Sequence, residues 1–374
     1  MAATIYDVAR RAGVTATTVS NVVRGKGSVG AETRERVRAA IATLDYRPNL
    51  VARGLARRRS ATLALLLPNI ANPFYPEIAL EVERIAGAHG YTLALCNTHD
   101  DDALGRAHLE SLLGRRVDGV LAMAGGLKPS DVRDAAARGL TIVLCNWSEV
   151  EEQAPALPGV EVDFRHGGEL AAAHLLALGH RHVAVIVQET GGIGGTDRSV
   201  RMPSHGERLQ GFRDRLAMAG APLPERWVLF GDATVQSGYR AAAALIDDAW
   251  GASGTRGARR PTALFATNDM MALGAIEAAT DAGLRVPDDL SVIGFDDIAL
   301  CAHLRPALTT IAIPKQELAT RSMELLLRHV DGADADAIPS RVTVLPHLVA
   351  RRSAARLNGN AFGGVFGGVY EERG

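Results

Sequence analysis

The sequence predicts a small all-α head joined to a larger α/β core of doubly wound parallel sheets. Its 374 residues exceed what one hydrophobic core organises efficiently, so the chain should divide into two or three units. Residues 1–60 carry 12 basic and four acidic side chains, and the remainder carries 29 and 38. A head of net charge +8 thus precedes a body of −9, which suits a polyanionic partner for the head alone. After residue 60, short apolar runs alternate with segments of helical periodicity, as in parallel sheets.

Two short helices are predicted within residues 4–23. Thr4 and Asp7 have the spacing of a capping box, apolar residues then recur at helical intervals, and Gly13 ends the first helix. Thr15 is the expected cap of the second helix. Two helices joined by a glycine-containing turn form a helix-turn-helix, whose second helix enters the major groove of DNA. An ordinary helical hairpin has the same spacing, and the positive charge favours the DNA-binding alternative.

Residues 32–44 predict a third amphipathic helix that closes a small core over the first two. Residues 49–57 have a different character, because Gly54 lowers the helix propensity of a segment already too short to be stable alone. This segment should fold only when another surface stabilises it. The alternative is a charged linker whose Leu55 packs on the next domain.

The motifs TIYDVARRAGVTATTVSNVVRG and TRERVRAAIATLDYRPNLVARGLARRRS resemble, in order and spacing, the head and hinge of the LacI/GalR family of bacterial transcription repressors. The resemblance implies a helix-turn-helix domain over residues 1–47 and a hinge helix or linker over 48–60, whose leucine enters the minor groove and kinks the DNA. Base edges would be touched by Ala16 and Thr17, and phosphates mostly by polar neighbours. The implied DNA-binding residues are Thr4, Tyr6, Thr15, Ala16, Thr17, Thr18, Ser20, Asn21, Arg24, Tyr46, Asn49, Arg53 and Leu55.

The body should contain two similar lobes with a cleft between them, because so many elements exceed one sheet. Candidate strands are residues 61–67, 92–96, 119–124, 141–145, 182–187, 227–230, 262–266 and 291–294. Candidate helices are residues 76–88, 103–113, 168–177, 206–219, 238–250 and 270–282. Ligands of doubly wound sheets bind beyond the carboxyl ends of the strands.

The segments NPFYPEI, TNDMMALGAIEA and VPDDLSVIGFDDI extend the resemblance, to the periplasmic-binding-protein-like core of the same family. It implies an effector-binding and dimerisation core over residues 61–353. The implied effector-binding residues are Phe74, Tyr75, Asn97, Asn146, Trp147, Ser204, Arg208, Asn268 and Asp296. Their amides, carboxylate, guanidinium and rings suit a sugar or sugar derivative, and a purine or nucleoside stays open. Asn268 is alternatively a helix cap, and Trp147 a core residue.

Three departures from the family concern the ligand and the tail. Ala233 stands where many relatives have an aromatic residue. Residues 189–205 form a longer, glycine-rich segment, which we interpret as a mobile loop at the cleft edge, since no Lys-Ser/Thr follows its GGIGG as in a phosphate-binding loop. Residues 354–374 are of low complexity, without leucine heptads, and are expected to be disordered.

Two other classes of protein fit the sequence poorly. An enzyme is not supported, because G-x-S-x-G, Walker A and dinucleotide-binding motifs are absent and the histidines lack metal-ligand spacing; no cofactor or metal is expected. A solute-binding transport component would need a signal peptide and no basic head. The three separate cysteines, Cys96, Cys145 and Cys301, are typical of a reducing cytoplasm. The sequence therefore predicts a cytoplasmic, nucleoid-associated, homodimeric repressor of palindromic operator DNA under allosteric control by an effector.

The hinge assignment makes one prediction. Leu55→Ala should weaken operator binding, because the side chain expected to enter the minor groove is lost, and should leave effector affinity unchanged. Fluorescence anisotropy with operator DNA measures the first quantity and calorimetry the second. Operator affinity equal to that of the wild-type protein would show that residues 49–57 are only a linker.

Overall fold

The computed structural model describes residues 3–23, 25, 27–47, 59–123, 125–147, 157–189, 203–250, 260–332 and 341–357. The chain divides into two compact units, residues 1–61 and residues 62–374. Within the described residues, no helix is long and apolar enough to cross a membrane.

The first unit is the predicted three-helix head, with α1 (Ile5–Ala12), α2 (Ala16–Val23) and α3 (Ala31–Thr43). The capping box is confirmed: the Thr4 hydroxyl oxygen accepts from the Asp7 backbone N at 3.3 Å, and the Asp7 carboxylate accepts from the Thr4 backbone N at 2.9 Å. Gly13 ends α1 with a φ of 63°, a conformation that glycine adopts without strain. One buried valine from each helix meets in the core, namely Val8, Val19 and Val37.

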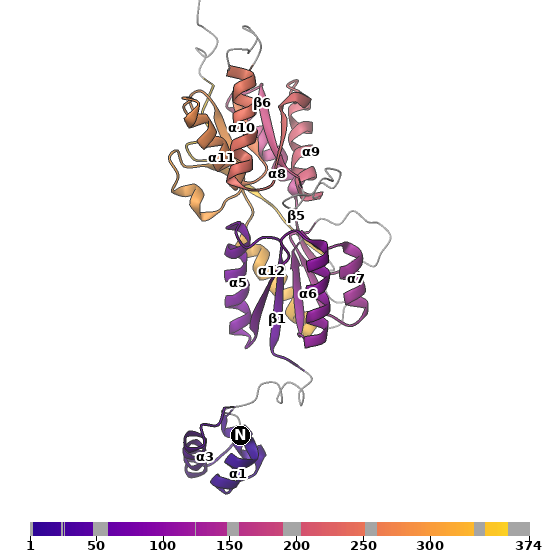
Figure 1. Ribbon diagram of the computed structural model, residues 1–374, viewed down its shortest axis with the longest axis vertical. Helices are drawn as coiled ribbons and strands as arrows, with labels where there is room; N and C mark the ends of the chain where they lie inside the picture. The colour runs from indigo at the N-terminus through magenta and orange to yellow at the C-terminus, as the bar shows by residue number, and fades with distance from the viewer. Residues whose placement is uncertain are drawn as a thin grey trace, which may run out of the picture. The chain divides into compact units, whose positions relative to one another are not determined.

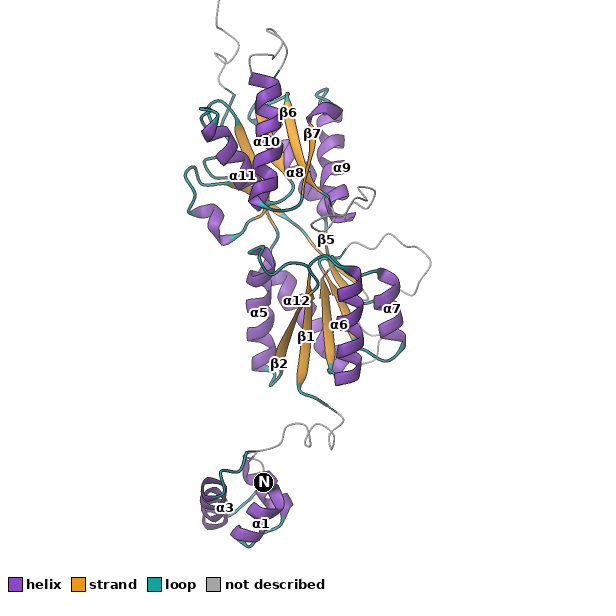
Figure 2. Cartoon of the chain, viewed as in Figure 1, coloured by secondary structure: helices purple, strands orange, loops and turns teal. Residues whose placement is uncertain are grey.

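The second unit contains two lobes, each built around a six-stranded sheet (Figures 1 and 2). Lobe 1 has the strand order β11-β5-β4-β3-β1-β2, and each pair is parallel. Its strands are β1 (Thr62–Leu67), β2 (Thr92–Asn97), β3 (Gly119–Met123), β4 (Ile142–Cys145), β5 (Gly159–Val162) and β11 (Arg341–Val344). Its helices are α5 (Phe74–Ala88), α6 (Asp102–Arg115), α7 (Pro129–Ala137) and α12 (Lys315–Val330).

Lobe 2 has the strand order β12-β10-β9-β8-β6-β7. Its strands are β6 (Val183–Gln188), β7 (Val228–Gly231), β8 (Ala263–Ala266), β9 (Ser291–Asp296), β10 (Thr309–Ala312) and β12 (His347–Val349). Its helices are α8 (Phe164–Ala177), α9 (Pro203–Met218), α10 (Val235–Trp250) and α11 (Asp269–Asp281), with short 3-10 helices at Glu225–Trp227 and Ala299–Ala302. The central strands of both lobes are buried on both faces, which explains their nearly continuous apolar sequences.

The chain passes between the lobes three times, after β5, after β10 and after β11. As a result α12, late in the sequence, packs beside α5 in lobe 1 (Figure 1). No pattern in the sequence predicted these returns. The elements that were not predicted are β5, β10, β11, β12, α7 and α12. The expectation of parallel sheets is wrong at one edge, where β12 runs antiparallel to β10.

Two expected loop segments begin or end differently in the structure. Helix α9 starts at Pro203, so Ser204 belongs to a helix and not to the loop predicted over 189–205; residues 190–202 lie outside the described residues. The tail expected to be disordered from Ala354 is held at its start. Leu357 N donates to Leu178 O at 2.9 Å, and the His180 Nε2 lies 3.0 Å from Ala355 O.

Helices α8 and α9 approach each other backbone to backbone through two glycines. A Cβ atom added to Gly168 would lie 2.0 Å from the Arg208 carbonyl oxygen, and one added to Gly211 would lie 2.0 Å from that of Arg165. Neither position has room for a side chain. This contact therefore sets the place of Arg208 relative to α8.

This packing predicts the effect of a single methyl group. Gly168→Ala should lower the free energy of unfolding by about 1–3 kcal/mol, as overpacking of a close helix contact does. Gly114→Ala is the control, because its Cβ in α6 would meet no atom within 4 Å and alanine is the better helix former. Urea unfolding measures both variants, and equal stability of the two would contradict the packing argument.

Candidate functional site

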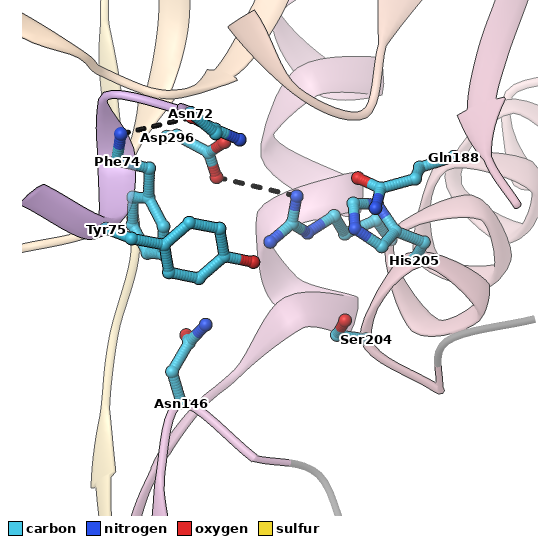
Figure 3. Close-up of a pocket in the computed structure, with 9 residues that line it drawn as sticks. Asn72, Phe74, Tyr75, Asn146, Gln188, Ser204, His205 and Asp296 are labelled. Atoms are coloured by element: carbon cyan, nitrogen blue, oxygen red, sulfur yellow. Dashed lines mark hydrogen bonds and ion pairs between the residues drawn. The ribbon is translucent and has the colours of Figure 1, made fainter. Parts of the chain in front are cut away.

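A pocket lies between the lobes at the carboxyl ends of their strands (Figure 3). The space between its lining atoms is about 360 Å³, and this volume counts the part that is open to solvent. Lobe 1 contributes residues after β1 and β4, and lobe 2 contributes residues at the ends of β6 and β9 and in the first turns of α9. The lining residues are Asn72, Phe74, Tyr75, Asn146, Gln188, Ser204, His205, Arg208 and Asp296.

Arg208 is the central charge of this pocket and is 3% exposed. Its guanidinium lies 3.9 Å from the ring centroid of Phe295 and 4.7 Å from that of Phe164. The Nη1 atom donates to the Thr267 backbone oxygen and lies 3.5 Å from Asp296 Oδ1. The buried Nε atom has no hydrogen-bond partner. A fixed cation thus keeps one donor for an acceptor from outside the chain.

Asp296 ends β9 with a φ of 110°, and its carboxylate forms the ion pair with Arg208 that a dashed line marks in Figure 3. Burial raises the pKa of Asp296 to about 7, although the Arg208 charge opposes that rise. The neighbouring carboxylate of Asp269 is fully buried and accepts from Thr310 Oγ1 at 2.6 Å and Ile298 N at 2.9 Å. Burial raises the pKa of Asp269 to about 6.

From lobe 1, Asn146 and Tyr75 line the same pocket as Arg208 and Asp296 of lobe 2. Asn146 has a φ of 59°, and its buried Oδ1 atom has no hydrogen-bond partner. The Tyr75 hydroxyl points across the pocket toward the side that carries Ser204 and His205 (Figure 3), and burial raises the pKa of the phenol, which therefore stays protonated. An unpartnered acceptor in lobe 1 and an unpartnered donor in lobe 2 thus line the same pocket.

A hydrogen-bond network around Thr267 orders the floor of the pocket in lobe 2. Thr267 Oγ1 accepts from the Gln188 backbone N at 3.0 Å and lies 3.1 Å from His205 Nδ1. Burial lowers the pKa of His205 well below its usual value, and the Arg208 charge lowers it further, so His205 is neutral at physiological pH. Asn268 Nδ2 donates to Gln188 Oε1 at 3.0 Å and thereby orients that amide.

Six of the nine expected effector-binding residues line the pocket: Phe74, Tyr75, Asn146, Ser204, Arg208 and Asp296. The other three do not. Trp147 is 6% exposed within the apolar core of lobe 1. Asn268 caps α11, its Oδ1 accepting from Met271 N at 2.8 Å, and Asn97 Oδ1 accepts from Ile70 N at 3.2 Å. For Trp147 and Asn268, the core and cap alternatives describe the structure.

Sequence reasoning missed three lining residues, Asn72, Gln188 and His205. Gln188 ends β6 and was detectable, because residues at the carboxyl ends of parallel strands face the ligand. Asn72 precedes α5, and its Oδ1 accepts from Phe74 N at 3.1 Å. His205 gave no signal beyond its place beside Ser204.

In the head, α2 presents the polar face that the sequence predicts. Val19 is fully buried, whereas Thr15 and Thr17 are exposed. Thr15 Oγ1 accepts from Thr18 N at 3.2 Å, as expected of a cap. Tyr6 on α1 is 70% exposed. Four of the expected DNA contacts lie outside the described residues: Arg24, Asn49, Arg53 and Leu55. The others lie in the described head: Thr4, Ala16, Ser20, Asn21 and Tyr46.

The helix-turn-helix head and the two-lobed core with its polar pocket are the architecture of a DNA-binding regulator that responds to a ligand. Residues 4–49 match the model of bacterial regulatory proteins of the lacI family, and residues 172–354 match that of a periplasmic binding protein-like domain. Catabolite control protein A of Priestia megaterium is 33% identical over 95% of this chain and 100% of its own. The chain belongs to the LacI family and is a DNA-binding transcriptional repressor regulated by an effector.

Solved structures agree with this assignment. The Lac repressor dimer bound to operator and the anti-inducer ONPF has a TM-score of 0.79 and 28% identity, over 95% of this chain and 100% of that one. The complex of transcriptional regulator CelR with cellobiose has a TM-score of 0.66 and 30% identity, over 94% and 100%. Because these relatives are regulators, the expectation that the chain is not an enzyme is confirmed.

The raised pKa of Asp296 predicts how stability depends on pH. A carboxyl of an unfolded chain titrates near ~4, whereas Asp296 titrates at about 7 in the folded protein. Between these values the folded state binds more protons, so this group lowers the free energy of unfolding as pH rises from about 4 to 7. Urea unfolding of Asp296→Asn should therefore show a shallower fall over this range than the wild-type protein. Superimposable pH profiles would contradict the prediction.

Proposed function

We propose that the pocket binds a neutral sugar or sugar derivative. The observation that carries the proposal is the pair of unpartnered buried atoms, Asn146 Oδ1 and Arg208 Nε, whose residues line the same pocket as Asp296. A hydroxyl both donates and accepts, so neighbouring hydroxyls satisfy this arrangement. Asp296, with a pKa of about 7, is partly ionised near neutral pH and then offsets the charge of Arg208, which favours an uncharged ligand. The cellobiose complex of CelR supports the same class of ligand.

A planar purine or nucleoside is the second candidate. Tyr75 lines the pocket with a partly exposed ring, but the other rings near the pocket favour such a ligand less. Phe74 and Trp147 are 3% and 6% exposed, so neither offers a free face for stacking. Arg208 covers the faces of Phe164 and Phe295. Ala233, with a φ of 66°, supplies no ring. The polar edges of the pocket therefore suit hydroxyl groups better than an aromatic base.

We further propose that the head recognises operator DNA as part of a homodimer. One helix reads only a few base pairs, so a homodimer with two heads would read two half-sites of a palindromic operator in the cytoplasm. The Lac repressor dimer bound to operator supports this arrangement. Effector binding between the lobes would alter their closure and thereby the two hinges. The coupling between pocket and operator would amount to about 1–3 kcal/mol.

Two measurements on the purified protein identify the ligands. Selection from random duplex DNA gives the operator, and a thermal-shift screen of sugars and nucleosides gives the effector, because a ligand at 100 times its Kd stabilises by about 2.7 kcal/mol. A response only to nucleosides would favour the second candidate. No response to either class would contradict both.

The decisive variant is Arg208→Ala. It removes the donor atoms of Arg208 from the pocket, so the thermal shift and the effector response of operator binding should be lost, while operator affinity without effector stays within about twofold. Arg215→Ala is the matched control, since Arg215 lies on the exposed side of the same helix and should behave as the wild-type protein. A normal effector response in Arg208→Ala would refute the assignment of the pocket.

A further inference from the structure

Two charged side chains, at the first turns of α5 and α12, bind lobe 2 beside the pocket, and Lys315 stands where the chain passes from β10 of lobe 2 into lobe 1. Glu77 lies in the first turn of α5, and Lys315 is the first residue of α12. The Lys315 Nζ is 3.0 Å from Glu77 Oε2. The other carboxylate oxygen, Oε1, accepts a hydrogen bond of 2.8 Å from the backbone N of Ala299, which follows β9 of lobe 2. One carboxylate thus binds both lobes.

Lys315 binds the same segment of lobe 2. Its ammonium donates to the backbone oxygen of Asp296 at 2.9 Å and to that of Asp297. Asp296 and Asp297 have φ angles of 110° and 53°, which L residues adopt only when the surrounding structure holds them there. The ammonium therefore holds the turn that carries the Asp296 carboxylate at the pocket.

Each lobe supplies a pocket residue and an interlobe contact from one short segment. In lobe 1, Tyr75 lines the pocket and Glu77 follows two residues later in the same helical turn. In lobe 2, Asp296 lines the pocket and Ala299 follows three residues later. Segments this short cannot change the pocket without moving the contact. Closure of the pocket and formation of these bonds are therefore mechanically linked.

The partial burial of the pair separates it from ordinary surface ion pairs. The side chains of Lys315 and Glu77 are 16% and 27% exposed. On the same helix, the pair Arg321 and Glu317 is 51% and 49% exposed. Charges that are partly removed from water interact more strongly, and separating the lobes would leave an ammonium and a carboxylate without these partners.

We propose that Glu77 and Lys315 form an interlobe latch that positions Asp296 and sets how readily the two lobes separate. A ligand held between the lobes favours the closed form, and loss of the latch lowers the fraction of protein that is closed. The regulatory meaning of the latch rests on the proposed function. Its test does not, because neither effector nor operator is needed.

The test compares full-length wild-type protein with Lys315→Met, Glu77→Gln, the double variant and Arg321→Met. Hydrogen exchange of residues 297–302 reports the bond from Ala299, and small-angle X-ray scattering reports the separation of the lobes. Lys315→Met should exchange about 10-fold faster in this segment, as expected for the loss of charge-assisted hydrogen bonds, and should have a larger radius of gyration. Exchange in β1 and β6 should not change. Arg321→Met should match the wild-type protein.

The remaining variants separate a latch from a space-filling role. The effects of Lys315→Met and Glu77→Gln should not add in the double variant, because the two side chains act on each other. Lys315→Arg, which keeps the charge and the donors, should restore slow exchange. If Lys315→Met does not fold, the smaller change in Glu77→Gln carries the test. Unchanged exchange at residues 297–302, or equal acceleration throughout both lobes, would overturn the proposal.

Discussion

The contact of the Arg208 guanidinium with the rings of Phe164 and Phe295 is the interaction on which the pocket depends. Its members come from three elements, α9, α8 and β9, and they meet because α8 and α9 touch at glycines. Both rings contact the cation from neighbouring directions, since their centroids lie only 6.4 Å apart, and the Thr267 carbonyl and the Asp296 carboxylate hold one edge. The edge of the guanidinium that carries Nε has no partner in the protein and is left for a ligand.

Buried charge is costly, and lobe 2 concentrates it. Arg208, Asp269 and Asp296 are at most 4% exposed, although apolar residues of similar volume would stabilise this region as well or better. Asp269 has a structural use, because it accepts bonds from β10 and from the segment after β9. Arg208 and Asp296 retain an unpartnered donor and a carboxylate at the pocket wall, so recognition explains their presence better than stability does.

The sequence located the pocket in part because residues at strand ends face the ligand in this architecture. Asn146 and Asp296 were found on that ground together with the family resemblance. Asn268 was expected at the pocket for the same reason, but its Oδ1 caps α11 and its amide contacts Gln188. A helix cap and a ligand contact both call for an asparagine at the end of a strand. Only the three-dimensional structure shows which of the two roles Asn268 has. The strands β5 and β11 were not predicted, because four residues are too few to show the apolar pattern of a strand.

The sequence by itself determined most of the head, because the capping box at Thr4, the glycine that ends α1 and the helical spacing of apolar residues are local features read within a few residues. It also determined the alternation that makes two parallel sheets. Only the tertiary structure decided which distant segments meet: Glu77 with Ala299, Arg208 with Phe295, and α12 with α5. Those pairs depend on three passages of the chain between lobes, and no local pattern encodes the packing of segments more than 80 residues apart.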